Sequence, residues 1–284
     1  MSSPGIVSSS GEPDLRHFSG QLTLVGAGKM GSALLQGWLR FGIEASKVTV
    51  LEPAPAPEIS ALRERGVRLN PGAATLSDVA AIIVAVKPQV ADEVLPGIAS
   101  MISPSTVVVS IMAGRTLRYL SGALKTSCAL VRAMPNTPAA IGRGVTVAVP
   151  LGASQAQRDL ADHLLRAAGT VEWIDDETLM DAVTAVSGSG PAYVFLLAEA
   201  LAQAGAAAGL PANLAARLAR ETIAGSGELL HLSALDPAVL RENVTSPGGT
   251  TAAALEVLMG RNGLARLMNE AVQAATVRSR ALAG

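Results

Sequence analysis

Two stretches rich in glycine and hydroxyl side chains stand out as candidate anion sites. VSGSGPAYVF occupies 186–195 and VTSPGGTT occupies 244–251, and each opens a run of helix-forming residues. The first turn of a helix leaves backbone N–H groups without intrahelical partners, and such groups bind carboxylates and phosphates. The same residue types also serve as ordinary caps and turns. A substrate site and simple helix capping therefore both remain open from these stretches alone.

A glycine-rich loop near the start of the chain has the spacing of a nucleotide site. In QLTLVGAGKMG, a short apolar run leads into Gly26-x-Gly28-x-x-Gly31, and a helical pattern follows. In dinucleotide-binding folds the first glycine permits a tight turn and the second lets the backbone approach a pyrophosphate. The third allows the helix to pack closely on the strand. The loop therefore predicts a dinucleotide site at the start of the first helix.

An acidic residue follows this loop at the distance that the fingerprint requires. The fingerprint includes a carboxylate about 20 positions further on, and Glu52 stands there at the end of the second apolar run. A carboxylate accepts hydrogen bonds from a ribose diol and repels a 2′-phosphate, which favours NAD. Arg63 and Arg65 follow closely, so a phosphate-binding role for them stays open. The alternative for Glu52 is a solvated strand end.

AVKPQ at 85–89 ends another apolar run. Ligands of open parallel sheets bind at the carboxyl ends of the strands, so Lys87 is a candidate contact for cofactor or substrate. The alternative is equally compatible with the sequence: Lys87 is a solvated charge and Pro88 starts the next helix.

The second half of the chain has no obvious strong base. The lysines are Lys29, Lys47, Lys87 and Lys125, and the histidines are His17, His163 and His231. Enzymes that reduce a carbonyl or oxidise an alcohol usually need such a base. An imine nitrogen is basic enough to take its proton from solvent or a hydroxyl group. A dinucleotide site beside two hydroxyl-rich helix starts therefore favours hydride transfer to an imine that carries a carboxylate.

The first half of the chain alternates between continuous apolar runs and helical patterns. The runs lie at 21–25, 47–52, 80–86, 106–111, 128–134, 145–149 and 171–174, and the helical patterns lie at 29–41, 58–65, 91–102 and 154–168. Continuous apolar runs are typical of parallel strands covered on both faces. The predicted fold is an α/β Rossmann-like N-terminal domain with a doubly wound, mostly parallel sheet.

The second half reads as helical throughout, with patterns at 175–186, 191–208, 212–233 and 250–284 that are rich in alanine and leucine. We expect a disordered N-terminal tail over 1–19, a dinucleotide-binding domain over 20–174 and an all-α substrate and dimerisation domain over 175–284. The hydrophobicity of the last segment indicates an oligomer interface. Packing of these helices on their own sheet is equally compatible with composition.

Composition excludes several other classes of protein. The net charge of −1 and the 2% of aromatic residues argue against nucleic-acid partners. The lone cysteine, Cys128, rules out an intrachain disulfide, and the dispersed histidines predict no metal. Residues 94–114 are uncharged but contain two prolines and four serines, so no membrane span is expected there. Without a secretory signal, we expect a cytoplasmic protein.

Five motifs together resemble one enzyme family. GAGKMG (26–31), AVKPQ (85–89), RAMPNTP (132–138), SGSGPAYVF (187–195) and ENVTSPGGTT (242–251) occur in the order and spacing of pyrroline-5-carboxylate reductase, and the similarity runs from Gln21 to near the C-terminus. The resemblance implies hydride transfer from NADPH or NADH to L-1-pyrroline-5-carboxylate, giving L-proline as the last step of proline biosynthesis. The alternative is a reductase of another small cyclic imine.

The resemblance also implies site residues and an assembly. The implied cofactor contacts are Gly26, Ala27, Gly28, Lys29, Met30, Gly31, Glu52, Val86, Lys87, Pro88, Met112, Ala113 and Gly114. The implied substrate contacts are Asn136, Ser187, Gly188, Ser189, Gly190, Gly248, Gly249, Thr250 and Thr251. Thr251 is the implied catalytic hydroxyl near the imine nitrogen, as proton donor or orienter. A homodimer is implied, with a decamer of five dimers in many members.

Two departures from the family pattern affect these expectations. Many members that prefer NADPH carry Ser, Asn or Arg after the second strand, whereas this chain has Glu52-Pro53-Ala54-Pro55. Some members also have a glutamate ahead of SPGGTT that approaches the substrate nitrogen. Here the stretch is HLSALDP (231–237), without a glutamate. Substitution by Asp236 and absence of this role both stay open.

Overall fold

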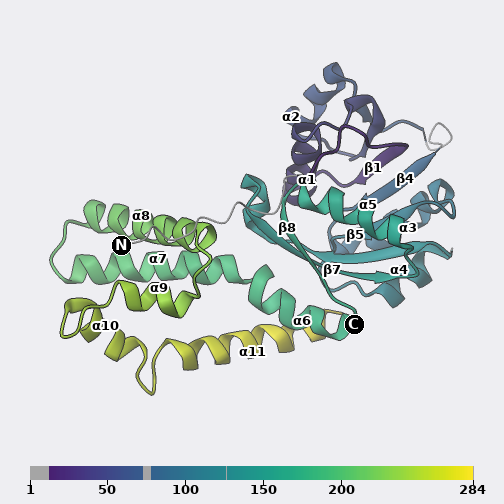
Figure 1. The fold of residues 1–284 in the computed structure, drawn as a ribbon. Coiled ribbons are helices and arrows are strands. Elements are labelled where there is room, and N and C mark those ends of the chain that lie inside the picture. The colour runs from purple at the N-terminus through teal and green to yellow at the C-terminus, as the bar shows by residue number, and fades with distance from the viewer. Residues whose placement is uncertain (1–12, 73–77, 126, 284) are drawn as a thin grey trace. The chain divides into compact units, whose positions relative to one another are not determined.

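The computed structural model describes residues 13–72, 78–125 and 127–283 (Figure 1). The chain divides into two compact units. One comprises residues 13–188 together with 275–283, and the other comprises residues 189–274.

The first unit is built on an eight-stranded sheet. Its strands are β1 (Gln21–Val25), β2 (Val48–Leu51), β3 (Arg68–Leu69), β4 (Val79–Val84), β5 (Val107–Ser110), β6 (Ala129–Met134), β7 (Gly144–Leu151) and β8 (Gly169–Trp173), in the order β3-β2-β1-β4-β5-β6-β7-β8. All neighbouring pairs are parallel except β6 and β7. The predicted doubly wound, mostly parallel sheet is confirmed.

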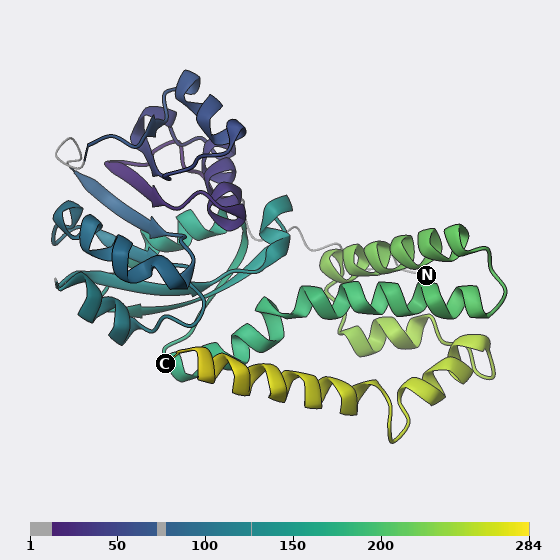
Figure 2. The same cartoon turned by 180° about the vertical axis from the view of Figure 1, so that it is seen from behind.

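Helices cover both faces of this sheet (Figures 1 and 2). On one face, α1 (Lys29–Arg40) and α5 (Gln155–Arg166) pack Leu34, Trp38 and Leu164 into one core cluster. On the other face, α3 (Ala91–Ile98) and α4 (Leu117–Leu124) contribute Leu95 and Leu120 to a second cluster. Alternate residues of β4 enter the two clusters, which explains why its sequence is apolar without interruption.

The chain reverses its direction of travel across the sheet between β1 and β4. From β1 it proceeds outward through β2 and β3, and it then returns to add β4 on the other side of β1. At such a switch point the loops diverge and leave a crevice at the carboxyl ends of the strands. The glycine-rich loop follows β1 and the AVKPQ segment follows β4, so the fold places both predicted cofactor segments at this crevice.

Three details of the first unit differ from the expectations. The strands β6 and β7 are antiparallel because residues 135–143 join them with only the 3₁₀ turn Thr137–Ile141, whereas a parallel crossover needs a dozen or more residues. The short strand β3 was not predicted, because two residues carry no periodicity. The helix α4 was also missed; its apolar face is buried, but its eight residues are few for a helical pattern.

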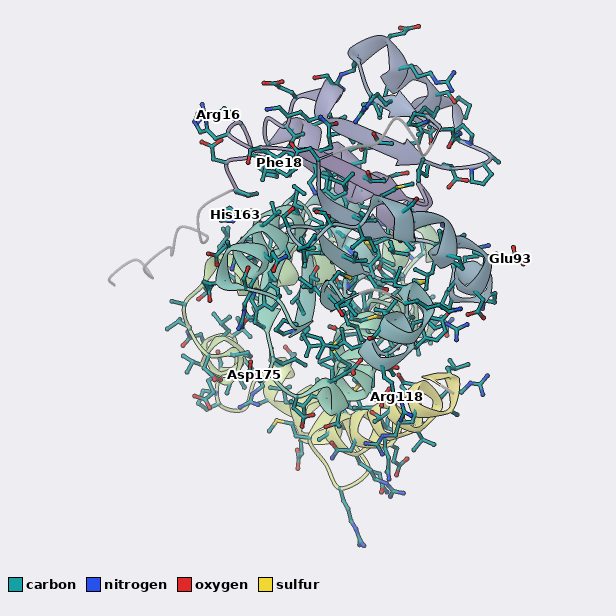
Figure 3. The ribbon with its side chains drawn as sticks, turned by 90° about the vertical axis from the view of Figure 1, so that its right-hand side faces the viewer. Arg16, Phe18, Glu93, Arg118, His163 and Asp175 are labelled. Atoms are coloured by element: carbon teal, nitrogen blue, oxygen red, sulfur yellow. The ribbon has the colours of Figure 1, made fainter. Side chains whose placement is uncertain are left out.

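The expected disordered tail is wrong for residues 13–19. Leu15 and Phe18 are buried in the first core cluster, and the Leu15 N–H donates to the Phe41 carbonyl oxygen. Arg16 between them lies at the surface (Figure 3). Two apolar side chains set among polar neighbours are enough to hold this short segment on the core. Residues 1–12 lie outside the described residues.

The second unit is helical. It contains most of α7 (Gly190–Ala207), α8 (Ala212–Leu232), α9 (Pro237–Asn243), α10 (Thr250–Leu258) and the first part of α11 (Leu264–Ala283). Small side chains let α7 and α8 approach closely, since a Cβ at Gly205 would lie 3.2 Å from the Ala215 Cβ. The single helix expected over 250–284 is wrong. It is interrupted at 259–263, where a Cβ at Gly263 would collide with the Leu258 carbonyl oxygen.

The segment between the sheet and α7 is short and irregular. The turn Glu177–Leu179 leads into α6 (Met180–Val183) and a π-helical turn, Thr184–Gly188. The C-terminal part of α11 packs here, because the Ser279 hydroxyl donates to the Asp181 carboxylate at 2.6 Å. The compact units divide after Gly188, and the domain boundary near Asp175 stays a prediction.

Candidate active site

A cavity of about 600 Å³ lies at the switch point of the sheet. The glycine loop, the end of β2 and the AVKPQ segment line it, with Gly26, Gly28, Glu52, Asn70, Val86 and Lys87 among the lining residues. The structure therefore brings together predicted cofactor residues from three separate stretches of the chain.

The three loop glycines occupy the positions that the dinucleotide fingerprint requires. Gly26 has φ of +91°, and a Cβ there would approach the Ala85 carbonyl oxygen at 2.8 Å. A Cβ at Gly28, the N-cap of α1, would project into open space. A Cβ at Gly31 would collide with the Gly26 carbonyl oxygen. Gly26 thus permits the tight turn, Gly28 leaves the backbone open to a ligand, and Gly31 allows the helix to pack closely. The loop therefore fits a dinucleotide.

The Glu52 carboxylate is bonded to the glycine loop. Its Oε2 accepts the Ala27 N–H at 2.9 Å, and its Oε1 accepts the Ala54 N–H at 3.2 Å. The side chain of Asn70, after β3, bonds to the Glu52 backbone. Sequence reasoning missed Asn70 because β3 is too short to reveal that a strand ends there.

Arg115 links two further predicted cofactor segments, residues 86–88 and residues 112–114. Its Nη2 donates to the Pro88 carbonyl oxygen at 2.7 Å, and its guanidinium lies over the Tyr119 ring at 4.4 Å. Burial, followed by the hydrogen bond that Tyr119 donates to Asp92, raises the pKa of the phenol. Arg115 directly follows Gly114, and this adjacency was the available signal for its role.

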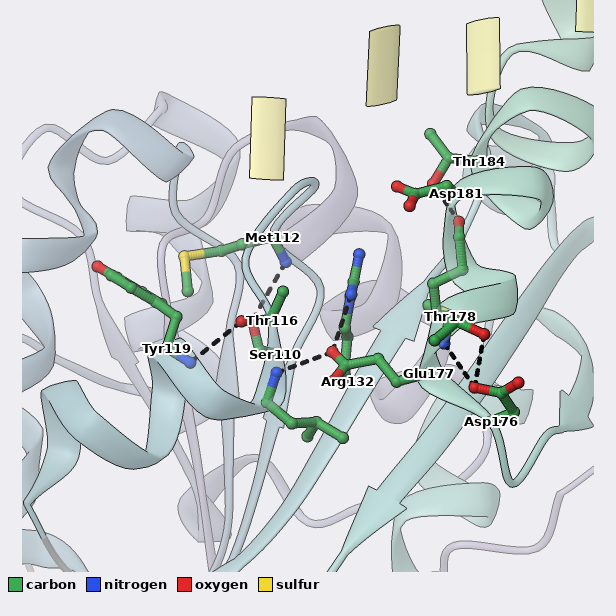
Figure 4. Close-up of polar contacts among 12 residues, drawn as sticks. Ser110, Met112, Thr116, Tyr119, Arg132, Asp176, Glu177, Thr178, Asp181 and Thr184 are labelled. Carbon is green, nitrogen blue, oxygen red and sulfur yellow. Dashed lines mark hydrogen bonds and ion pairs between the residues drawn. The ribbon is translucent and has the colours of Figure 1, made fainter. Parts of the chain in front are cut away.

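Met112, the first residue of the segment 112–114, lies beside a group of polar contacts (Figure 4). The Met112 N–H donates to the Ser110 hydroxyl at 3.3 Å, while the Met112 side chain is buried. Beside it, Glu177 Oε1 accepts from Arg132 Nη1 at 2.8 Å and from the Leu117 N–H at 2.8 Å. Arg132 is only 5% exposed. One carboxylate thus joins β6, the start of α4 and the segment after β8.

Asn136 connects two predicted substrate segments. Its Oδ1 accepts the Val145 N–H at 2.9 Å, and its Nδ2 donates to the Ser187 carbonyl oxygen at 3.1 Å. Ser187 and Gly188 lie in the π-helical turn, a geometry found frequently at functional sites. The Ser187 hydroxyl donates to the Val183 carbonyl oxygen. The structure therefore gives Asn136 a positioning role in holding this turn, and substrate contact stays a prediction.

The second predicted anion site forms the start of α10 in the helical unit. Gly248 has φ of +69° and Gly249 is the N-cap, with no side chain capping the helix. Thr250 and Thr251 are therefore in the first turn, where N–H groups have no intrahelical carbonyl partner. Two nearby polar groups are already used. The Thr245 hydroxyl donates to the Arg241 carbonyl oxygen, and Asp236 caps α9 by accepting the Ala238 N–H.

Comparison with known proteins gives a consistent result for both parts of the chain. Residues 177–282 match the family model described as pyrroline-5-carboxylate reductase dimerisation, and residues 21–114 match the model described as NADP oxidoreductase, coenzyme F420-dependent. A curated pyrroline-5-carboxylate reductase of Pseudomonas aeruginosa is 37% identical over 93% of this chain and 97% of its own length. The chain belongs to the pyrroline-5-carboxylate reductase family.

Other members of the pyrroline-5-carboxylate reductase family match along the same length. The enzyme of Synechocystis is 40% identical over 92% of this chain and 98% of its own length. The solved reductase of Coxiella burnetii aligns with a TM-score of 0.87 at 30% identity, covering 93% of this chain and 99% of that one. The Plasmodium falciparum reductase, solved with NADP bound, aligns with a TM-score of 0.78 at 30% identity, covering 94% and 99%. The resemblance carried by the five motifs is confirmed.

Proposed function

We propose that this chain reduces L-1-pyrroline-5-carboxylate to L-proline with NADPH or NADH, the last step of proline biosynthesis. The observation that supports the proposal most strongly is the cavity over the glycine loop in a chain of this family. The NADP bound to the Plasmodium falciparum relative also supports a nicotinamide dinucleotide.

The cofactor contacts that we propose lie in the first unit. They are Gly26, Ala27, Gly28, Lys29, Met30, Gly31, Glu52, Val86, Lys87, Pro88, Met112, Ala113 and Gly114, of which Gly26, Gly28, Glu52, Val86 and Lys87 line the cavity. The bound cofactor supplies a hydride to the imine carbon. The backbone N–H groups at the start of α1 bind phosphate oxygens, and Glu52 accepts hydrogen bonds from ribose.

The substrate contacts that we propose lie at the two hydroxyl-rich stretches. The N–H groups of Gly248, Gly249 and Thr250 bind the substrate carboxylate, with the positive end of the α10 dipole adding to the attraction. The Thr251 hydroxyl donates a hydrogen bond to the imine nitrogen, either protonating it or orienting it. Ser187, Gly188, Ser189 and Gly190 complete the contacts, with Asn136 holding their backbone.

The helical segment is a dimerisation domain. Within a single chain α7 has no fully buried residue, and Phe195 and Leu196 are 68% and 62% exposed. The stretch Glu177–Ala207 is long and apolar enough to cross a membrane by length and composition. We propose instead that a second copy of the chain covers this surface in a cytoplasmic homodimer, and that five dimers assemble into a decamer.

A single assay tests the reaction. Purified protein is incubated with pyrroline-5-carboxylate and either NADH or NADPH, and loss of cofactor absorbance is measured together with proline formation. We expect proline in proportion to the cofactor oxidised. Absence of turnover with both cofactors would refute the proposal. Turnover of another cyclic imine at a much higher kcat/KM would instead assign the alternative substrate.

A further inference from the structure

Asn70 is built into the end of β3 in a way that a simple turn does not require. Its N–H donates to the Val50 carbonyl oxygen at 2.9 Å, continuing the ladder between β2 and β3. Its backbone then turns to φ of +50°, a conformation that asparagine tolerates better than most residues. Its side-chain Oδ1 accepts the Glu52 N–H and its Nδ2 donates to the Glu52 carbonyl oxygen, both at 2.8 Å. The carboxamide therefore pairs with Glu52 as the backbone of a further strand residue would.

Glu52 is consequently held at both ends. Asn70 bonds both polar groups of its backbone, and the N–H groups of Ala27 and Ala54 bond its two carboxylate oxygens. Each carboxylate oxygen accepts more than one hydrogen bond, so the outer lone pairs still suit the hydroxyl groups of a ribose. A carboxylate fixed in this way cannot swing aside at low cost to admit a second anion.

The charged side chains around the cavity also disfavour a phosphate group beside Glu52. The ionisable side chains among its lining residues are Glu52, Lys87 and Glu93. Lys87 follows β4, and β1 separates that strand from β2, which Glu52 follows. Arg63 donates to the Leu69 carbonyl oxygen at 3.4 Å, and neither Arg63 nor Arg65 belongs to the described lining. A phosphate group beside Glu52 would meet a fixed negative charge without an adjacent lining cation.

We propose that Asn70 is a specificity-determining positioning residue, which holds Glu52 so that the cavity accepts the ribose of NADH and disfavours the 2′-phosphate of NADPH. This inference rests on the proposed function for the identity of the cofactor. Asn70 holds the backbone of Glu52, and the Glu52 carboxylate supplies the discrimination.

Equilibrium binding of NADH and NADPH to the purified protein tests the inference without relying on turnover. We expect the wild-type protein to bind NADH about 10- to 100-fold more tightly than NADPH, because the ribose of NADH forms a hydrogen bond to the charged Glu52 that NADPH loses. Glu52→Gln removes the charge and is expected to bring the two dissociation constants within about threefold. Asn70→Gly retains the positive φ but removes the carboxamide, and is expected to weaken NADH about tenfold while changing NADPH little.

Lys125→Gly is the matched control for the backbone change. Lys125 has φ of +51°, is exposed and lies away from the cavity, so this variant is expected to retain the wild-type preference. If Asn70→Gly does not fold, Asn70→Ser replaces it, because its shorter, uncharged side chain does not reproduce the paired hydrogen bonds to the Glu52 backbone. Tighter or equal binding of NADPH by the wild type overturns the inference. The inference is also overturned if the preference for NADH over NADPH changes in Glu52→Gln but not in the folded Asn70 variant. Selective NADH binding without reductase activity would refute the proposed function and leave this inference standing.

Discussion

Two threonine hydroxyl groups near the start of α10 have different roles. The Thr245 hydroxyl is used at the C-terminal end of α9, where it donates to the Arg241 carbonyl oxygen at 2.7 Å. Thr251 lies in the first turn of the helix and is only partly exposed. The same side-chain type therefore stabilises a helix end at one position and is proposed to reach the substrate at the other.

Thr251→Ala tests the proposed proton-handling hydroxyl. Loss of one hydrogen bond to a charged group costs about 1.5–3 kcal/mol, so kcat is expected to fall about 10- to 150-fold. The dissociation constant for NADH is expected to stay unchanged. Steady-state kinetics and nucleotide titration measure the two quantities. Thr245→Ala is the control from the preceding helix end, and equal losses of kcat in both variants would contradict a special role for Thr251.

Substitutions of two loop glycines are expected to affect different properties, nucleotide binding at Gly28 and folding stability at Gly31. Gly28→Ala projects a methyl group into open space at the cavity, so it is expected to weaken NADH at least about tenfold through a lost phosphate contact. Its melting temperature is expected to stay near wild type. Gly31→Ala forces a methyl group against the Gly26 carbonyl oxygen, and overpacking of this kind costs about 1–3 kcal/mol. Thermal unfolding distinguishes the two variants; a stable Gly31→Ala protein would contradict the packing argument.

At the scale of elements, the polar cluster around Glu177 ties three segments together. Arg132 comes from β6, Leu117 begins α4, and Glu177 follows β8. Arg132 lies in the predicted apolar run 128–134, but no partner was predicted for it. Pairing with Glu177 spans 45 residues, and no local pattern reveals which carboxylate such a buried arginine meets.

Glu177→Ala tests how much this cluster stabilises the first unit. Removing one partner of a buried ion pair leaves the other charge uncompensated, which costs about 3–5 kcal/mol; the 27% exposure of the Glu177 side chain places the expected loss at the lower end. Chemical unfolding measures the change in free energy. Asp14→Ala breaks the exposed pair with Arg16 and is the control, with a much smaller expected loss because the pair is solvated. Similar losses of unfolding free energy in the two variants would contradict a stabilising role for the polar cluster around Glu177.

The elements predicted best were those whose local pattern is strong. Long apolar runs such as 80–86 gave β4 within one or two residues, and the glycine fingerprint located the start of α1. β3, α4 and α9 were missed because each is short. The break between α10 and α11 was missed because alanine-rich sequence continues on both sides, while the chain turns at Gly260 and Gly263 through contacts that periodicity does not report.

At the scale of the whole molecule, the sequence identified the family but not the internal contacts of its site. Two of the five motifs, GAGKMG and AVKPQ, contribute residues to the lining of the cavity. Asn70 could not be predicted from sequence, since it acts by bonding the backbone of another segment. Such contacts depend on strand order, and strand order follows from packing along the entire chain.

The oligomer gives a prediction at this scale. A carboxylate buried in an apolar interface costs several kcal/mol, and about 3 kcal/mol corresponds to a roughly 100-fold weaker dimer. Phe195→Glu is therefore expected to shift the protein toward monomers, measured by size-exclusion chromatography with light scattering. Gln203→Glu places the same charge on the same helix at an already polar position and serves as control. A wild-type protein that is monomeric at micromolar concentration would refute the proposed assembly.

The apolar surface of α7 has a consequence for how the protein responds to dilution. A helix that carries apolar residues on all sides cannot satisfy them within one chain, so part of the folding free energy is realised only on association. By mass action, each tenfold dilution of a folded dimer then removes about 1.4 kcal/mol of its stability. The melting temperature is accordingly expected to rise with protein concentration.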